Sequence, residues 1–329
     1  MVNNKKILQE FVQNKIEQCK VLVIGDVMLD KYYFSEVKKI SPEAPVPVAK
    51  VVKQKETLGG AANVANNLAL LGCQTYLMGS VGADYHRIGL EQQLAEKNID
   101  YRGLICSKGP TTTKLRVMGG HQQMIRLDFE ETMPLQQAEE EQIYAYLEQL
   151  FAVGIDSVII SDYAKGVCTF GICQRAIQLC NHYSIPIIID PKGTDWAKYA
   201  GADYLTPNLK EINEVMPELI LNEDTAIIKA AEYIKGQHAI KNIMVTRSEK
   251  GLSLITNGQT IHIPTLAQEV FDVSGAGDTV IAVMALALAG KLAPADAAFL
   301  ANLAASVVVA KLGTYAIHKE ELLAALSKI

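Results

Sequence analysis

Short apolar runs alternate with longer amphipathic stretches along most of the chain. The runs are rich in Val and Ile, as is typical of strands buried on both faces. Predicted strands cover Val21–Gly25, Thr75–Gly79, Ser157–Ser161, Pro186–Asp190, Tyr204–Pro207 and Ile243–Thr246. Predicted helices cover Ala61–Leu71, Ile88–Lys97, Leu135–Phe151, Phe170–Tyr183, Glu223–Gly236 and Val280–Leu288. This alternation predicts an α/β fold with a mainly parallel sheet that helices cover on both faces.

Two segments depart from this pattern. Residues 32–58 and 111–130 alternate between apolar and polar positions, and Gly119-Gly120 predicts a hairpin turn in the second segment. Several prolines in the first segment suit an edge strand better than a central one. We therefore expect a small accessory β-sheet, built from two separated pieces of the chain.

Polar residues stand at or just after the ends of several predicted strands. They are Asp26, Asp162, Asp190 and Asn208. In parallel sheets, ligands bind at the carboxyl ends of the strands. These residues are therefore candidates for a binding site at one edge of the sheet.

A glycine-rich turn, Ser274-Gly275-Ala276-Gly277-Asp278, precedes the apolar helix Val280–Leu288. Small residues allow a tight turn, and the first amides of a helix form a ready anion site. A carboxylate beside that site could take a proton from a hydroxyl while the amides neutralise a transferring phosphoryl group. The alternative is a connector in which Asp278 only caps the helix.

Two further motifs change the balance. Gly59-Gly60-Ala61-Ala62-Asn63 opens another small-residue helix, and Asn208-Leu209-Lys210-Glu211 has an Asn-x-x-Glu spacing. With Gly275-Ala276-Gly277-Asp278, these motifs resemble, in the same order, the signatures of the ribokinase-like (PfkB) sugar kinases. The resemblance runs from about Val21 to Leu326. It implies a ribokinase-like fold, with residues 32–58 and 111–130 as a lid over the sugar.

Four other segments resemble one branch of that family, the bacterial D-glycero-β-D-manno-heptose-7-phosphate kinases. They begin at Gly25-Asp26-Val27-Met28-Leu29-Asp30, Ser41-Pro42-Glu43-Ala44-Pro45, Ser161-Asp162-Tyr163-Ala164-Lys165-Gly166 and Asp190-Pro191-Lys192-Gly193. The resemblance implies phosphorylation of the anomeric hydroxyl of the heptose 7-phosphate, for lipopolysaccharide core synthesis. No His-x-Gly-His motif is present, so we expect one kinase domain over residues 1–329 and no adenylyltransferase domain. The runner-up is another sugar kinase of this family, a ribokinase or fructokinase.

The resemblance assigns roles residue by residue. Asp278 would be the catalytic base, and the amides of Gly275, Ala276 and Gly277 would hold the transferring phosphoryl group. The sugar would be bound by Asp26, Gly59, Gly60 and Asn63, with Asp30 a weaker candidate. A substrate that carries a phosphate also needs cations, and the candidates are Lys114, Arg116, Arg126, Lys165 and Lys192. Among them we favour Arg116 and Lys192.

ATP and Mg²⁺ are the cofactors that the family implies. Glu211 would act on Mg²⁺ through water, with Asn208 beside it, although Asn and Glu three apart also form a capping box. Thr246 and Gly251 bound a loop on the nucleotide side, and Asn302 would approach the adenine. Asp272 and residues 311–314 could form a site for a monovalent cation such as K⁺.

Composition narrows the function classes. The 329 residues are 49% apolar and carry a net charge of −5, without a basic run, which argues against nucleic acid as a partner. No apolar run reaches the roughly 18 residues of a membrane span. Six cysteines without a C-x-x-C pair fit reduced thiols in the cytoplasm.

We expect a homodimer formed through the lid. A dinucleotide-dependent oxidoreductase would need G-x-G-x-x-G after the first strand, and a non-catalytic sugar sensor would not need Asp278.

Overall fold

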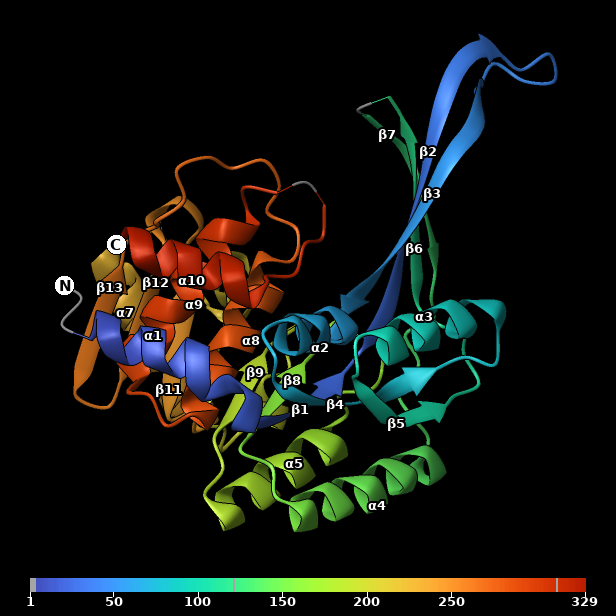
Figure 1. Cartoon of the computed structure of the whole chain (residues 1–329). Coiled ribbons are helices and arrows are strands. Elements are labelled where there is room, and N and C mark those ends of the chain that lie inside the picture. The colour runs from blue at the N-terminus through green and yellow to red at the C-terminus, as the bar shows by residue number, and fades with distance from the viewer. Residues whose placement is uncertain (1–3, 121, 312) are drawn as a thin grey trace.

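A nine-stranded sheet forms the centre of the larger part of the molecule (Figure 1). The computed structural model describes residues 4–120, 122–311 and 313–329. The strand order is β13-β12-β11-β10-β9-β8-β1-β4-β5. In chain order these strands are β1 Lys20–Gly25, β4 Gln74–Val81, β5 Asp100–Cys106, β8 Ser157–Ser161, β9 Ile187–Asp190, β10 Tyr204–Leu205, β11 Asn242–Thr246, β12 Leu252–Thr256 and β13 Gln259–Ile263. All neighbours are parallel except β11–β12 and β12–β13.

Helices cover both faces of this sheet. The described α-helices are α1 Lys5–Asn14, α2 Ala61–Leu70, α3 Tyr85–Glu96, α4 Gln137–Val153, α5 Phe170–Tyr183, α6 Leu209–Val215, α7 Asp224–His238, α8 Ala276–Ala289, α9 Pro294–Val308 and α10 Lys319–Lys328. One apolar core joins α1, α2, α8, α9 and α10 to the sheet, and a second joins α4, α5 and α7 to its other face. Successive residues of a strand feed opposite cores. Val21 and Val23 enter the first core, while Leu22 and Ile24 enter the second.

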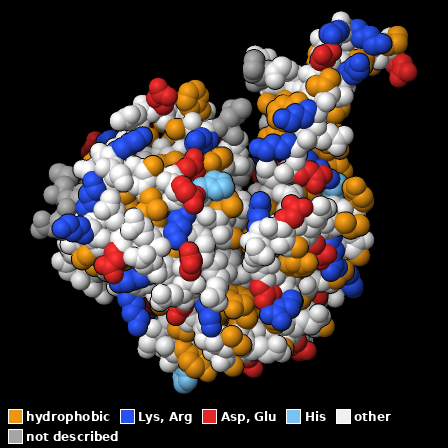
Figure 2. Space-filling view, in the orientation of Figure 1, with side chains coloured by type: hydrophobic (Ala, Val, Ile, Leu, Met, Phe, Trp, Pro, Cys, Tyr) orange, Lys and Arg blue, Asp and Glu red, His pale blue; other side chains and the backbone are white. Residues whose placement is uncertain are grey.

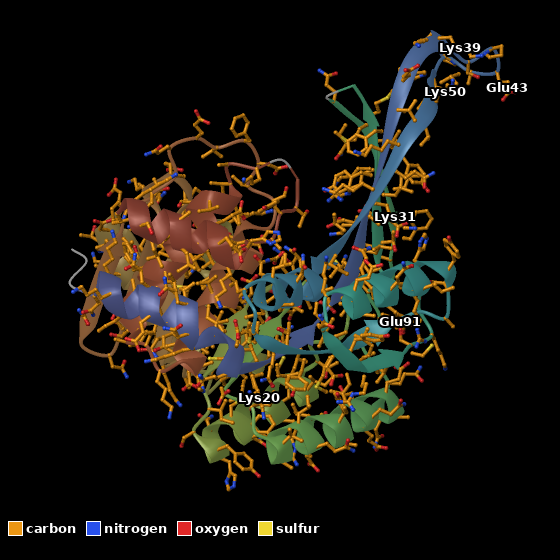
Figure 3. All side chains as sticks on the ribbon, in the orientation of Figure 1. Lys20, Lys31, Lys39, Glu43, Lys50 and Glu91 are labelled. Carbon is orange, nitrogen blue, oxygen red and sulfur yellow. The ribbon has the colours of Figure 1, made fainter. Side chains whose placement is uncertain are left out.

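A second sheet projects from this body as a long twisted ribbon (Figure 1). Its strands are β2 Val27–Ile40, β3 Pro47–Gly60, β6 Thr113–Gly119 and β7 Gln122–Phe129, in the order β3-β2-β6-β7. We call it the lid sheet. Lys39, Glu43 and Lys50 lie at the far end of the β2–β3 hairpin, away from the body (Figure 3).

The register gives the lid sheet two different faces. Tyr32 pairs with Lys55 and Arg116, and Arg116 pairs with Arg126, so these side chains form one row on one face. We call this the cationic face. The next positions along the strands point the opposite way. They carry Leu115, Val117, Ile125, Leu127 and Phe129, which define the apolar face.

The structure confirms the predicted fold class and most predicted elements within a few residues. It differs at the sheet's two ends. The antiparallel hairpin β12–β13 and the edge strand β5 were not among the predicted strands. Within the described residues, no helix combines the length and apolar character needed to cross a bilayer.

Candidate active site

The start of α8 forms an open amide cradle. Gly275, the residue before the helix, has φ +80°, a left-handed conformation that favours glycine. Among the described residues, the amides of Gly275, Gly277 and Asp278 have no hydrogen-bond acceptor. The Ala276 amide donates to the Val273 carbonyl at 3.2 Å. The cradle therefore offers the amide of Asp278 in place of that of Ala276, and the dipole of α8 favours an anion there.

Asp278 is buried in the first turn of α8 and both of its oxygens accept hydrogen bonds. Asn63 Nδ2 donates to Oδ2 at 2.7 Å, and the Tyr163 hydroxyl donates to Oδ1 at 2.6 Å. Burial raises the pKa of Asp278 to about 6, although these two hydrogen bonds lower it and Asp30 raises it further. A carboxylate with such a pKa is ionised at neutral pH and is suited to general-base work.

A cleft of about 590 Å³ opens beside Asp278. Its lining residues come from five segments at the carboxyl ends of the strands and the start of α8, and they are Tyr163, Asp190, Thr206, Asn208, Glu211, Thr246, Gly275, Gly277, Asp278 and Val280. Burial raises the pKa of Asp190 well above its usual range, and the charges of Glu211 and Asp278 add to this effect. Asp190 and Glu211 place carboxyl oxygens, the type of ligand that Mg²⁺ prefers, on the wall of this cleft.

Asn208 and Glu211 form a reciprocal cap at the start of α6. Asn208 Oδ1 accepts from the Glu211 amide at 2.9 Å, and Glu211 Oε2 accepts from the Asn208 amide at 3.0 Å. The capping-box alternative is therefore present, and it leaves one Glu211 oxygen for other partners. Lys192 Nζ donates to that oxygen, Oε1, at 2.9 Å. Partial burial opposes the charge of Lys192, but the bond with Glu211 raises its pKa.

The sugar side of the site lies where the lid sheet joins α2. Gly60 precedes α2 with φ +54°, and a Cβ there would lie 2.5 Å from the Asp26 carbonyl oxygen. Gly59 lies beside Asp30, because a Cβ on Gly59 would be 2.6 Å from Asp30 Oδ2. Arg116 Nη1 donates to Asp30 Oδ1 at 2.5 Å and its guanidinium stacks on Tyr32. Asp30, Gly59 and Arg116 therefore share one corner of the site.

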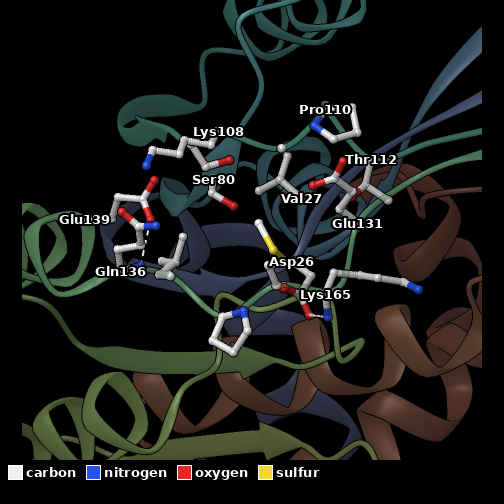
Figure 4. A pocket seen from close by; sticks show the side chains of 15 residues that line it. Asp26, Val27, Ser80, Lys108, Pro110, Thr112, Glu131, Gln136, Glu139 and Lys165 are labelled. Carbon is white, nitrogen blue, oxygen red and sulfur yellow. Dashed lines mark hydrogen bonds between the residues drawn. The ribbon is translucent and has the colours of Figure 1, made fainter.

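The environment of Asp26 differs from that of the other residues that were predicted to bind the sugar. Its carboxylate accepts from the backbone amides of Tyr163, Lys165 and Val167 at 2.8, 3.0 and 3.1 Å. It is buried and lines a second cavity of about 570 Å³, on the side of Lys165, Lys108 and Glu131 (Figure 4). These bonds give Asp26 a role in holding the 163–167 loop. A contact with the sugar stays a prediction.

The predicted nucleotide-side residues are spread along the rim. Thr246 lines the cleft, and Gly251 ends the 3₁₀ turn Ser248–Lys250 that follows it. Asn302 Nδ2 donates to the Pro264 carbonyl at 2.8 Å, which ties α9 to the segment after β13. Its approach to an adenine stays a prediction.

The predicted cation residue Asp272 binds the loop that was predicted with it. Its carboxylate accepts from the amides of Ser274 and Gly313 at 2.9 and 3.0 Å. Burial opposes the ionised form, but these amides lower the pKa of Asp272 overall. Leu312, within the predicted 311–314 loop, lies outside the described residues.

The structure adds evidence that three more residues belong to the site. Tyr163 contacts Asp278 directly, Asp190 lines the cleft, and Asp30 faces Asp278 closely enough to raise its pKa. Each lies in a segment whose sequence already suggested the family, so a signal was present. The sequence alone could not show which of Asp26 and Asp30 turns toward the base.

Comparison with known proteins agrees with this geometry. Residues 18–321 match the pfkB family of carbohydrate kinases. The chain belongs to this family. It is 41% identical over 326 residues to the bifunctional protein HldE of Trichlorobacter lovleyi, covering 98% of the chain and 66% of that relative. It is 44% identical over 309 residues to HldE of Haemophilus influenzae, covering 94% of the chain and 63% of that relative. The chain thus spans less than two thirds of the length of these curated relatives.

Two solved structures illustrate the shared fold. Phosphofructokinase-2 from Escherichia coli in complex with potassium matches with a TM-score of 0.75 at 20% identity, over 94% of this chain and 99% of that one. Arabidopsis thaliana ribokinase complexed with ribose and ATP matches with a TM-score of 0.71 at 21% identity, over 94% and 98%. These likenesses confirm the ribokinase-like architecture.

Proposed function

We propose that this carbohydrate kinase transfers the γ-phosphoryl group of ATP to the anomeric hydroxyl of D-glycero-β-D-manno-heptose 7-phosphate, giving the 1,7-bisphosphate. The observation that carries the proposal is the buried Asp278 carboxylate, held between Asn63 and Tyr163 at the start of α8, where three amides have no acceptor among the described residues. The relatives named HldE and the four branch-specific segments support the choice of substrate.

In this proposal, Asp278 accepts the proton of the sugar hydroxyl as its oxygen attacks the γ-phosphorus. The amides of Gly275, Gly277 and Asp278 donate to the transferring oxygens, where the positive end of α8 stabilises their charge. Positioning and charge neutralisation account for most of the catalysis in phosphoryl transfer. Mg²⁺ carried by ATP would supply further neutralisation, held through water by Glu211 with Asp190 close by.

The cationic face of the lid sheet supports a phosphorylated sugar. Arg116 lies between Asp30 and Tyr32, and the register places Arg126 and Lys55 in the same row. A phosphate of two negative charges would be drawn to this row, and arginine can bind it through two parallel hydrogen bonds. Lys192 pairs with Glu211, which lines the cleft, so we assign Lys192 to the nucleotide phosphates in place of the sugar phosphate.

A coupled assay of ADP release tests the proposal. Heptose 7-phosphate, fructose, fructose 6-phosphate, ribose and adenosine are offered separately, and Asp278→Asn serves as the inactive control. We expect the highest kcat/KM for heptose 7-phosphate. A higher value for an unphosphorylated hexose or pentose would replace the proposal with a fructokinase or ribokinase activity.

We further propose a homodimer built on the apolar face of the lid sheet. Ile125 and Leu127 are 52% and 41% exposed there, on a strand whose outer edge has no partner among the described residues. Figure 2 shows hydrophobic side chains among the charged ones along the projecting lid sheet. Exposed apolar faces of this kind are typical of protein interfaces. A monovalent cation beside Asp272 and a cytoplasmic location also remain proposals.

A further inference from the structure

We propose that Tyr163 is the positioning residue for the catalytic base. Its hydroxyl fixes the orientation of the Asp278 carboxylate and favours the ionised form of that group. The conformation of the loop 162–167 places this hydroxyl beside Asp278. The inference rests on the proposed role of Asp278 as the base. It assigns a function to a tyrosine that sequence motifs left without one.

The first argument is the geometry of the carboxylate. Tyr163 donates to Oδ1 at 2.6 Å, while Asn63 donates to Oδ2 at 2.7 Å. The Asp278 carboxylate is therefore held by one donor from the loop after β8 and one from α2. Each carboxylate oxygen has two acceptor positions. One position on each oxygen therefore stays available for the sugar hydroxyl, and the plane of the carboxylate is fixed before the substrate arrives.

The second argument is the way the loop is held. Asp26 accepts from the amides of Tyr163, Lys165 and Val167, and Asp162 Oδ1 accepts from the Ala164 amide at 2.7 Å. Ala164 has φ +55°, a left-handed conformation that costs free energy in a residue with a Cβ. Two buried carboxylates thus hold a strained turn, and the side chain that the turn delivers to the cleft is Tyr163.

The second carboxylate oxygen of Asp162 also accepts hydrogen bonds. Lys198 Nζ and the Tyr199 hydroxyl both donate to its Oδ2. The support of the loop therefore extends to the 3₁₀ turn Ala197–Tyr199. A rigid support of this depth is what a catalytic side chain needs to stay within a few tenths of an ångström of its place.

The charges around Asp278 explain why a hydrogen-bond donor is needed. The negative charge of Asp30 from β2 raises the pKa of Asp278, and Asn63 from α2 is neutral. Burial, and then the charges of Asp278 and Asp190, raise the pKa of Tyr163 far above its usual range. The phenol therefore keeps its proton and acts as a donor at every pH at which the enzyme would work.

The test compares Tyr163→Phe with a matched control, Tyr146→Phe. The Tyr146 hydroxyl also donates to an aspartate, Asp100, at 3.3 Å, but in the region of α4 and β5, away from the cleft. A charge-assisted hydrogen bond changes a pKa by about one unit or more. We expect Tyr163→Phe to shift the acid limb of the kcat/KM profile upward by about one pH unit. Tyr146→Phe should leave that limb in place.

A second measurement does not depend on turnover. Titration of ¹³C-labelled aspartate carboxyl groups, assigned with Asp278→Asn, reports the pKa of Asp278 in the free protein. The pKa should rise in Tyr163→Phe, and to a smaller extent in Asp26→Asn, which loosens the loop. Unchanged pKa values in both variants of a folded protein would overturn the inference. A raised pKa in a protein that phosphorylates none of the sugars tested would uphold the contact and reject the proposed function.

Discussion

Replacing Arg116 with glutamine should separate recognition of the sugar phosphate from every other step. The Arg116 side chain is 21% exposed and is fixed between Asp30 and the Tyr32 ring, so it is largely desolvated before a ligand binds. A charge-assisted contact with phosphate contributes roughly 1.5–3 kcal/mol. At about 1.4 kcal/mol per tenfold change, KM for heptose 7-phosphate should rise roughly ten- to a hundredfold, while KM for ATP stays near the wild-type value.

Arg116→Gln also removes the ion-pair partner of Asp30, and this complicates the interpretation of the change in KM. An unpaired Asp30 would retain a negative charge close to the incoming phosphate and would add to the loss. A double-mutant cycle with Asp30→Asn isolates that contribution. If Arg116 contacts the phosphate directly, Arg116→Gln should still weaken binding in the Asp30→Asn background.

Two comparisons make the result decisive. Dephosphorylated heptose should be a poor substrate for the wild type and should lose little more in Arg116→Gln. Arg102→Gln, which breaks an exposed ion pair with Asp100, controls for a general effect of lost charge. Coupled ADP release at saturating ATP gives all of these constants. Equal losses on the phosphorylated and dephosphorylated sugars would refute the assignment and make Arg116 a support for Asp30.

Four further predictions rest on other features of the structure. Asp278→Asn should lower kcat by at least about a hundredfold while fluorescence titration still detects ATP binding; near-normal turnover would exclude Asp278 as the base. Because Asp278 works only when ionised and burial raises its pKa to about 6, kcat/KM of the wild type should fall as the pH drops below that value, and a flat profile down to pH about 5 would contradict this. Leu127→Glu should convert a dimer into a monomer in light scattering at micromolar concentration, whereas a wild-type monomer would reject the interface itself. Lys192→Gln should raise KM for ATP more than KM for the sugar, since Lys192 lies beside Glu211 in the cleft.

The central sheet could be predicted because its strands carry an unambiguous signal. β1 and β8 contain the unbroken apolar runs 21–24 and 158–160, because both faces of each strand meet helices, and such runs are typical of central strands. The edge strand β5 lacked this signal, because it alternates buried with partly exposed positions and includes Gly103. The hairpin β12–β13 was missed because its polar outer strand resembles a surface loop.

The site could be predicted only as far as local motifs reach. The turn before Asp278 and the glycines before α2 are local, and both open helices as expected. The partners of Asp26 and Lys192 depend on segments distant in sequence. Asp26 binds amides more than 130 residues away, and Lys192 binds Glu211, so charge and position near a strand end could not distinguish their partners.

Asp26 and Asp30 have different roles because the chain leaves the central sheet between these two residues. β1 ends at Gly25, and β2 begins at Val27 in the lid sheet, so Asp26 occupies the junction between the two sheets. Its amide donates to the Ser161 carbonyl, which keeps it with the body, while Asp30 travels with the lid sheet. The base and its support thus belong to the body, and the residues proposed to read the phosphate belong to the lid sheet. A sugar bound between them would contact both, and this would exclude water from the transfer.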